Sequence, residues 1–199
     1  MTRPDPTRDQ HEAPPLPPRR DGTDRYAVLF VCLGNICRSP MAEAIFIHHA
    51  HARGLAPRLD IDSCGLGDWH VGGPADPRTI AACRARGVNV PSIARLWNPR
   101  RDPARFDLIL PMDRQNHRTL LSRDAPRDRV RMMRLFEPAD TAQSGTGPRP
   151  TPAPLLFPDA AAIPDVPDPY TGPDSGFDDL YHMLERSCLN LLDHIERSL

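Results

Sequence analysis

The sequence predicts an α/β fold: a single domain built on a short parallel sheet of about four strands, with helices on both faces. Three observations predict it. Short apolar runs alternate along the chain with segments that have helical periodicity. The runs are continuously apolar, as expected for strands that are covered on both faces. A length of 199 residues suits one domain with a sizeable core.

The first strand and helix are expected near the N-terminus. Residues 26–31 read Tyr-Ala-Val-Leu-Phe-Val and are expected to form the first strand. Ser39 and Pro40 then offer an N-cap and a proline at the first helical position, so residues 41–52 are expected to continue as a helix. The loop between them is expected at the carboxyl edge of the sheet, where ligands bind in such folds.

The second unit comprises a strand over residues 59–64 and a helix over residues 78–86. Asp76 and Pro77 mark the start of this helix, and Gly87 marks its end. Both boundaries follow the preference for proline at a helix start and glycine after a helix end.

The rest of the domain repeats the alternation. Residues 106–110 and 130–136 are expected to be the third and fourth strands, with a helix over residues 113–122 between them. A long final helix is indicated by an apolar stripe that comprises Phe177, Leu180, Leu184, Leu191 and Ile195.

Two proline-rich segments interrupt this pattern. Residues 1–24 contain many prolines and charges and almost no large apolar side chain, so we expect a disordered Pro/Arg-rich tail. Residues from about 138 to 167 are too numerous for an ordinary loop and are expected to be an insertion. Residues 25–199 are therefore expected to form one domain that carries this insertion.

The composition argues against several classes of function. The formal net charge is −1, which does not favour a surface that binds nucleic acid. The longest apolar run is far shorter than the ~20 residues of a membrane helix, and no secretory signal is visible. The five cysteines are odd in number and irregularly spaced, which argues against a disulfide framework and favours a reducing, cytoplasmic location.

The loop between the first strand and the first helix carries the chemistry. In such a loop, successive backbone N–H groups point inward at the positive end of a helix dipole and bind an anion. Gly34 permits the turn, and Arg38 adds a planar fork of donors for phosphate oxygens. Cys32 is expected beneath the anion, where this positive charge favours a thiolate, the nucleophile for phosphoryl transfer.

Three other interpretations of Cys32 and Cys37 remain open. The pair could bind a metal, although four intervening residues are the upper edge of zinc spacing and no second Cys or His pair is evident. The two thiols could form a disulfide that protects the nucleophile, which is compatible with catalysis. Both could be buried apolar side chains. The Cys-x5-Arg-Ser spacing between a strand and a helix favours catalysis.

Residues 32–43 read Cys-Leu-Gly-Asn-Ile-Cys-Arg-Ser-Pro-Met-Ala-Glu and resemble the signature loop of low-molecular-weight protein tyrosine phosphatases. Three further stretches resemble the same family in the same order. Parts of residues 62–78 resemble its second strand and pocket wall, residues 107–116 its third strand and the following helix, and residues 168–172 its general-acid loop. The resemblance covers most of the chain outside the two proline-rich segments.

The resemblance implies an enzyme that hydrolyses aryl phosphates through a phosphocysteine. Cys32 would attack phosphorus, Arg38 and the loop amides would hold the phosphate oxygens, and Asp168 would be the general acid and then the general base. The mechanism needs no metal and no cofactor. The phosphate-binding residues besides Arg38 would be Leu33, Gly34, Asn35, Ile36, Cys37 and Ser39.

Other residues acquire roles from the same resemblance. Ser39 would donate a hydrogen bond to the thiolate, Asn35 would support the loop, and Ser63 would support Asn35. Trp69 and Tyr170 match positions that flank the aromatic ring of the substrate, where stacking contributes ~0.5–1.5 kcal/mol.

The resemblance also indicates the class of substrate. Ile36 matches the phosphotyrosine branch of the family, whereas a Thr there would match its phosphoarginine phosphatases. The implied substrates are phosphotyrosyl proteins, with bacterial tyrosine kinases among them. Asp113 would be structural. Two residues depart from the family pattern: Arg86 replaces a His that many relatives link to the loop Asn, and Thr171 replaces a second Tyr of animal relatives.

Two alternative functions remain. An arsenate reductase would use the same loop but relay electrons through further cysteines, and Cys64, Cys83 and Cys188 are isolated in the sequence. A non-catalytic phosphoprotein-binding module would need neither the thiol nor the acid. A histidine cluster at positions 48, 49 and 51 is expected at the solvated end of the first helix rather than on a metal. The sequence makes no prediction of oligomeric state.

Overall fold

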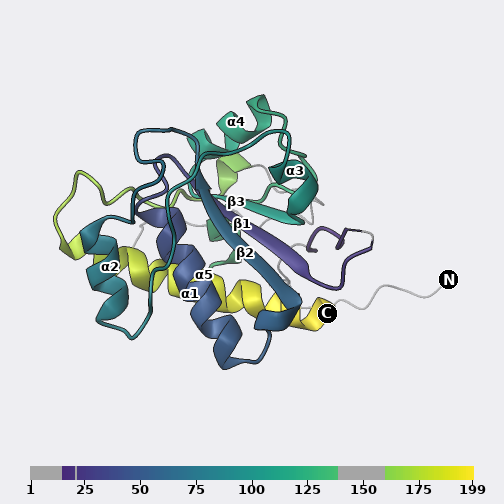
Figure 1. Cartoon of the computed structure of the whole chain (residues 1–199), viewed down its shortest axis with the longest axis horizontal. Coiled ribbons are helices and arrows are strands. Elements are labelled where there is room, and N and C mark those ends of the chain that lie inside the picture. Colours follow the sequence, from purple (N-terminus) through teal and green to yellow (C-terminus); the bar gives the residue numbers. More distant parts are fainter. Residues whose placement is uncertain (1–14, 21, 139–159) are drawn as a thin grey trace.

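Three parallel strands form the centre of the molecule in the computed structural model (Figure 1). The central strand β1 (Tyr26–Cys32) pairs with β2 (Leu59–Gly65) on one side and with β3 (Leu108–Pro111) on the other. All residues of β1 are buried, as its continuously apolar sequence predicts. Because the strands are parallel, their carboxyl ends lie at one edge of the sheet, where the chain leaves β1 at Cys32.

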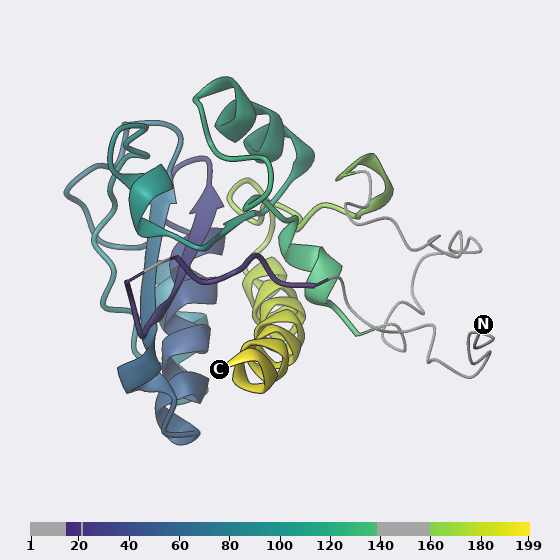
Figure 2. The same cartoon turned by 90° about the vertical axis from the view of Figure 1, so that its right-hand side faces the viewer.

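Three helices cover one face of the sheet. They are α1 (Arg38–Ala52), α2 (Pro77–Arg84) and α5 (Ser175–Ser198). Figure 2 shows α1 and α5 side by side beneath the strands, and the two helices pack against each other. Val28 and Phe30 of β1 point into the core that these helices close.

Two other helices cover the opposite face (Figures 1 and 2). They are α3 (Asp102–Arg105) and α4 (Arg114–Ser122). The β1 side chains that point to this face are buried in a second core cluster. Its larger members include Leu29, Val31, Trp97, Phe106 and Leu120. The predicted α/β class, a parallel sheet with helices on both faces, is confirmed.

The segment expected to be the fourth strand forms only one bridge. Val130 pairs with Ile109, and the chain then turns into a 3-10 helix, η2 (Met133–Phe136). Met133 and Phe136 are both buried in the core beneath α5. A 3-10 turn places residues three apart on one side, whereas a strand would point them to opposite faces. Burial of both side chains therefore ends the strand.

The helix boundaries depart slightly from those expected. Ser39 was expected as the N-cap of the first helix, but Cys37 holds that position and Ser39 lies inside α1. Asp76 and Asp113 cap α2 and α4, each accepting a hydrogen bond from a backbone N–H of the first turn. Elsewhere in the described ranges, η1 (Ala56–Arg58) and η4 (Ala160–Ala162) are also 3-10 helices.

The structure describes residues 15–20, 22–138 and 160–199. Parts of both proline-rich segments lie within these ranges and pack on the domain. The Tyr26 hydroxyl donates to the carbonyl of Pro17 at 3.0 Å. The remainder of the expected tail and insertion lies outside the described residues. No helix in the described ranges is both long enough and apolar enough to cross a membrane.

Candidate active site

The loop after β1 lies at the carboxyl edge of the sheet and leads directly into α1. Asn35 in this loop has a φ of 56°, the left-handed region that residues with a Cβ rarely adopt. At Gly34 a Cβ would approach the Cδ2 atom of His70 to 3.2 Å, so the close packing of the loop favours glycine there. The backbone therefore follows the tight turn that an anion-binding loop requires.

The sulfur of Cys32 lies at the base of this loop. It is 3.0 Å from the Ser39 hydroxyl oxygen and accepts a hydrogen bond from the backbone N–H of Asn35 at 3.3 Å. The side chain is buried beside the N-terminus of α1. A hydroxyl, a backbone N–H and the first turn of a helix therefore surround the sulfur. These contacts agree with the roles expected of Cys32 and Ser39.

Arg38 begins α1 and is also buried. Its Nη1 atom donates to a carboxylate oxygen of Asp113 at 2.7 Å and to the carbonyl of Val166 at 3.3 Å. Its Nη2 atom donates to a carboxylate oxygen of Asp168 at 2.5 Å. Burial alone would lower the pKa of Arg38, but the neighbouring Cys32, Asp168 and Asp113 more than offset it, and the pKa lies above its usual value.

Asp168 reaches Arg38 from the loop that precedes α5, far away in the sequence. Its second carboxylate oxygen accepts a hydrogen bond from the backbone N–H of Tyr170 at 3.2 Å. The Asp168 side chain is 44% exposed, whereas that of Arg38 is 4% exposed. The guanidinium is therefore fixed, and the carboxylate that contacts it lies at the solvent boundary. The structure brings Cys32, Arg38 and Asp168 to one site, as expected from the sequence.

The Asn35 side chain connects the loop to its surroundings. Its amide nitrogen donates to the hydroxyls of Ser39, at 2.9 Å, and Ser63, at 2.8 Å. Its amide oxygen accepts from the backbone N–H of Arg95 at 2.9 Å. With all three contacts made, the strained backbone of Asn35 is held by partners on β2, α1 and the segment after α2. Ser63 thus lies where the resemblance placed it.

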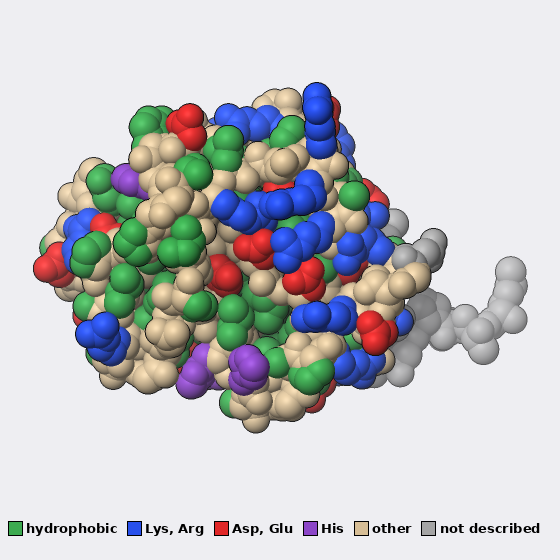
Figure 3. Space-filling model, viewed as in Figure 1, with side chains coloured by type: hydrophobic (Ala, Val, Ile, Leu, Met, Phe, Trp, Pro, Cys, Tyr) green, Lys and Arg blue, Asp and Glu red, His purple; other side chains and the backbone are tan. Residues whose placement is uncertain are grey.

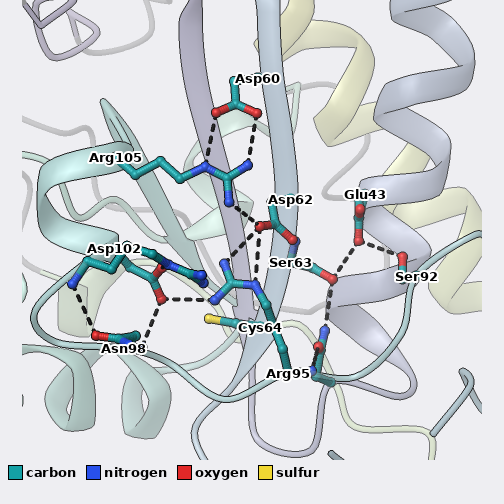
Figure 4. A network of polar contacts seen from close by, with 12 residues as sticks. Glu43, Asp60, Asp62, Ser63, Cys64, Ser92, Arg95, Asn98, Asp102 and Arg105 are labelled. Carbon is teal, nitrogen blue, oxygen red and sulfur yellow. Dashed lines mark hydrogen bonds and ion pairs between the residues drawn. The ribbon is translucent and has the colours of Figure 1, made fainter. Parts of the chain in front are cut away.

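Glu43 extends this network, and the sequence analysis missed it. Its Oε2 atom accepts hydrogen bonds from the hydroxyls of Ser63 and Ser92, each at 2.6 Å (Figure 4). Burial raises the pKa of Glu43, and the two serine hydroxyls oppose that shift. The spacing in the sequence could have indicated this residue. Glu43 lies four residues after Ser39, so the two side chains lie on one side of α1.

The departure at Arg86 has no bearing on the loop. Arg86 forms an ion pair with Asp178 and lies over the ring of Tyr181, both on α5. The hydroxyl that reaches the loop network instead belongs to Ser92 (Figure 4). The position that supports the loop from this side is therefore six residues further along the chain than the one singled out in the sequence.

A layer of ion pairs lies behind the loop network. Arg95 bridges Asp62 of β2 and Asp102 of α3, with contacts of 3.0 and 2.9 Å. Arg105 pairs with both Asp60 and Asp62, at 3.0 and 2.9 Å (Figure 4). Positive and negative side chains also interleave on the surface over this part of the sheet (Figure 3). The backbone of Arg95 that supports Asn35 is thus anchored to two elements.

The two residues expected as aromatic walls have different surroundings. Tyr170 is half exposed and lines a groove together with Ile36 and His70. Its ring centroid lies 6.5 Å from that of His70. Trp69 is 71% exposed, packs over Gly67 and is not among the residues that line this groove. His70, the neighbour of Trp69 in the chain, therefore shares this groove with Tyr170, and the role expected of Trp69 stays a prediction.

The remaining cysteines are buried and free. Burial raises the pKa of Cys37 to about 12 and that of Cys83 to about 12, so both are thiols at neutral pH. In the described ranges, no three side chains of the metal-binding types come together. In the histidine cluster at the end of α1, His49 pairs with Glu185 of α5.

Comparison with known proteins connects these features to one family. Residues 27–150 match the family model described as low molecular weight phosphotyrosine protein phosphatase. A protein of that name from Schizosaccharomyces pombe is 38% identical over 87% of this chain and 99% of its own length. A low molecular weight protein-tyrosine-phosphatase from Streptomyces coelicolor is 37% identical over 84% of this chain and 92% of its own.

A solved structure extends the likeness to three dimensions. The protein tyrosine phosphatase of Entamoeba histolytica, crystallised with Hepes in its active site, has 33% identity and a TM-score of 0.71. The match covers 87% of this chain and 98% of that one. The chain belongs to the low molecular weight phosphotyrosine protein phosphatase family and is, as its relatives are named, a protein-tyrosine-phosphatase, a phosphoric monoester hydrolase.

Proposed function

We propose that this chain hydrolyses phosphotyrosine in proteins through a phosphocysteine intermediate on Cys32. One observation carries the proposal: three groups with complementary chemistry meet at the N-terminus of α1. Cys32 supplies a buried sulfur with two hydrogen-bonding partners, Arg38 a buried cation, and Asp168 a carboxylate 2.5 Å from that cation. A nucleophile, a group that binds phosphate and an acid are the parts that ester hydrolysis at phosphorus needs.

Substrate binding begins with an exchange of anions on Arg38. The phosphate oxygens take the guanidinium N–H groups that Asp168 occupies in the free protein. The backbone N–H groups of residues 33–39 complete the phosphate site, which involves Leu33, Gly34, Asn35, Ile36, Cys37 and Ser39. The released carboxylate takes up a proton from solvent and then lies beside the ester oxygen, because its loop also carries Tyr170 at the mouth of the site.

The first chemical step transfers the phosphoryl group to sulfur. The thiolate of Cys32 attacks phosphorus, an S–P bond forms and the bond from phosphorus to the phenolic oxygen breaks. Asp168 gives its proton to that oxygen, so tyrosine leaves as a neutral phenol. Arg38 and the loop amides hold the equatorial oxygens as their charge shifts, which stabilises the transition state.

The second step restores the enzyme. The carboxylate of Asp168 accepts a proton from a water molecule as that water attacks phosphorus, and the S–P bond breaks. The hydroxyl of Ser39, 3.0 Å from the sulfur, donates a hydrogen bond to the leaving thiolate. Inorganic phosphate is then released, and Asp168 loses the proton to solvent and returns to Arg38 as a carboxylate.

The groove beside the site suits a flat aromatic ring. Tyr170, His70 and Ile36 line it. We expect the exposed Trp69, which precedes His70 in the chain, to add a further wall when a ring is bound. A phosphotyrosyl side chain fits these walls better than an aliphatic phosphoester, because the rings add stacking energy. The proposed substrates are phosphotyrosyl proteins, bacterial tyrosine kinases among them.

Neither alternative function has a specific observation in its favour. An arsenate reductase needs further thiols that exchange with an oxidised sulfur, and burial raises the pKa of Cys64, Cys83 and Cys188, which makes them poor nucleophiles. A module that only binds phosphoproteins leaves the contact between Asp168 and Arg38 without a purpose.

Replacement of the nucleophile tests the proposal. Cys32→Ser should abolish turnover of p-nitrophenyl phosphate while inorganic phosphate still binds in calorimetry, since the amides and Arg38 remain. Cys83→Ser is the matched control, because it makes the same change in a buried cysteine of α2. Turnover by the Cys32 variant near that of the unaltered chain would exclude the phosphocysteine route.

A further inference from the structure

A groove of about 540 Å³ extends from the active site along α2. One side of that helix forms its wall, through Pro77, Ile80, Ala81 and Arg84. The spacing of three, four and seven residues places these four on a single helical stripe. In Figure 1, α2 lies beside the loop that leads into α5, and Figure 3 shows apolar side chains gathered on this side of the molecule.

The near end of the groove is continuous with the phosphate loop. The backbone N–H of Asp76 donates to the carbonyl of Ile36 at 2.9 Å, so the start of α2 is attached to the loop. Ile36 and Tyr170 line the groove as well as the mouth of the site. The Asp76 carboxylate accepts both a side-chain and a backbone hydrogen bond from Arg78, which leaves this end without an unpaired charge.

The far end of the groove carries an unpaired cation. Arg84, the last residue of α2, is exposed, and no carboxylate among the described residues pairs with it. Eight residues separate it from Asp76, which corresponds to about 12 Å along the helix axis. An extended peptide rises about 3.3 Å per residue, so it covers this distance in three to four residues.

The middle of the groove is apolar. Between Asp76 and Arg84 the helix contributes Pro77, Ile80 and Ala81 to the lining, and Pro74 and Ala75 contribute from just before the helix. A peptide that enters the active site with its phosphotyrosine and runs along α2 would therefore meet an apolar wall first and a positive charge afterwards. Its complement is a segment with an apolar side chain near the phosphotyrosine and a carboxylate beyond it.

We propose that this groove binds the residues that flank phosphotyrosine in the substrate and that Arg84 selects an acidic side chain three positions from it. Ile80 contacts an apolar side chain on the way. The inference rests on the proposed phosphatase function and deepens it, because it names the peptide sequence that the site prefers. Arg84 touches neither the phosphate nor the reacting atoms, so it determines specificity rather than chemistry.

Matched phosphotyrosyl peptides test the inference. One carries Asp three residues before the phosphotyrosine, one carries Asp three residues after it, and each is paired with a peptide that has Asn at the same position. The measurement is the ratio of kcat/KM for each Asp peptide to that of its Asn partner. This ratio is internal to each variant, so any general change in activity cancels.

The unaltered chain should favour one of the two Asp peptides by about three- to fivefold, as expected for a partly exposed ion pair. Arg84→Ala should bring that ratio to about one, and Arg84→Glu should invert it. Arg118→Ala, which removes an exposed arginine from α4 on the other side of the sheet, should keep the ratio.

Two results would overturn the inference. In the first, the unaltered chain shows a kcat/KM ratio of about one for both pairs of Asp and Asn peptides. In the second, the preference for an Asp peptide is retained in Arg84→Ala. Failure of the underlying function looks different, because the unaltered chain would then turn over neither the peptides nor p-nitrophenyl phosphate.

Discussion

The two edges of the sheet both bury charge, but they hold it in different ways. At the amino edge, the fully buried carboxylate of Asp107 accepts hydrogen bonds from the backbone N–H groups of Ala27 and Arg20, at 2.7 and 2.8 Å. The Arg20 side chain adds an ion pair at 2.9 Å. At the carboxyl edge, the buried cation of Arg38 contacts side chains from two loops.

The difference lies in which partners can leave. Two of the three bonds to Asp107 come from backbone groups, so they persist while the chain stays folded. Asp168 is a partly exposed side chain on a loop, and a phosphate can replace it on Arg38 without loss of the fold. We therefore expect changes at the amino edge to cost stability and changes at the carboxyl edge to cost activity.

The largest expected effect is that of Asp168→Ala on slow substrates. Without a proton donor, kcat for phenyl phosphate should fall by about 10²–10³-fold, whereas p-nitrophenyl phosphate, with a better leaving group, should lose much less. Steady-state kinetics with a series of aryl phosphates measures this. The urea midpoint should change little, since Arg38 keeps Asp113.

Asp165→Ala is the control for that variant. Asp165 lies three residues earlier on the same loop and pairs with Arg114 at the surface. It should leave the dependence on the leaving group intact. An equal loss for good and poor leaving groups in Asp168→Ala would remove Asp168 from the role of acid.

At the amino edge, Asp107→Asn should destabilise the fold by about 3 kcal/mol. The neutral amide cannot accept all three hydrogen bonds, and the Arg20 guanidinium loses its anion. Urea unfolding monitored by circular dichroism gives the free energy. The kcat for p-nitrophenyl phosphate, measured well below the unfolding midpoint, should stay within about twofold. A large fall in kcat without loss of stability would contradict the contrast between the edges.

Arg20→Ala should have a smaller effect at the same edge, about 1 kcal/mol. The Arg20 side chain is 22% exposed, so water replaces part of the lost contact, and the backbone bond to Asp107 remains. Arg19→Ala is the comparison, because Arg19 is exposed and its side chain donates to the carbonyl of Asp24. Equal free energies of unfolding for the two variants would show that residues 15–20 add nothing through this contact.

The sequence predicted the carboxyl edge better than the amino edge, for a physical reason. The loop chemistry is local: Cys32, Gly34 and Arg38 lie within seven residues and are placed by one turn and one helix start. The contact between Arg20 and Asp107 joins residues 87 positions apart, and no periodicity connects them. Residues 15–20 therefore look like a solvated tail in sequence although they pack on the domain.

The same limit explains the missed parts of the site. Asp168 was found only through the resemblance, because 130 residues separate it from Arg38. Ser92 and Glu43 carry no pattern that joins α1 to the segment after α2. Residues 133–136 were predicted as part of a strand but form a 3-10 helix. An apolar run predicts that its side chains are buried, but not whether they lie on one side of the backbone.

The smallest expected effect is that of Glu43→Gln, a change at the carboxyl edge that should alter stability. Burial raises the pKa of Glu43, so its contribution to stability is fully present below about pH 4.5, its ordinary value, and is lost as the pH rises through the higher value of the folded state. Glu43→Gln keeps an oxygen for Ser63 and Ser92 but cannot ionise. The variant should therefore gain stability relative to the unaltered chain as the pH rises from 4.5 towards neutrality, because only the unaltered chain then buries a charge.

Urea unfolding across this range gives the difference between the free energies of unfolding of the two proteins. The contributions of the other titrating groups cancel in this difference. A difference that is flat with pH would mean that the two serine hydroxyls compensate fully for the burial of Glu43.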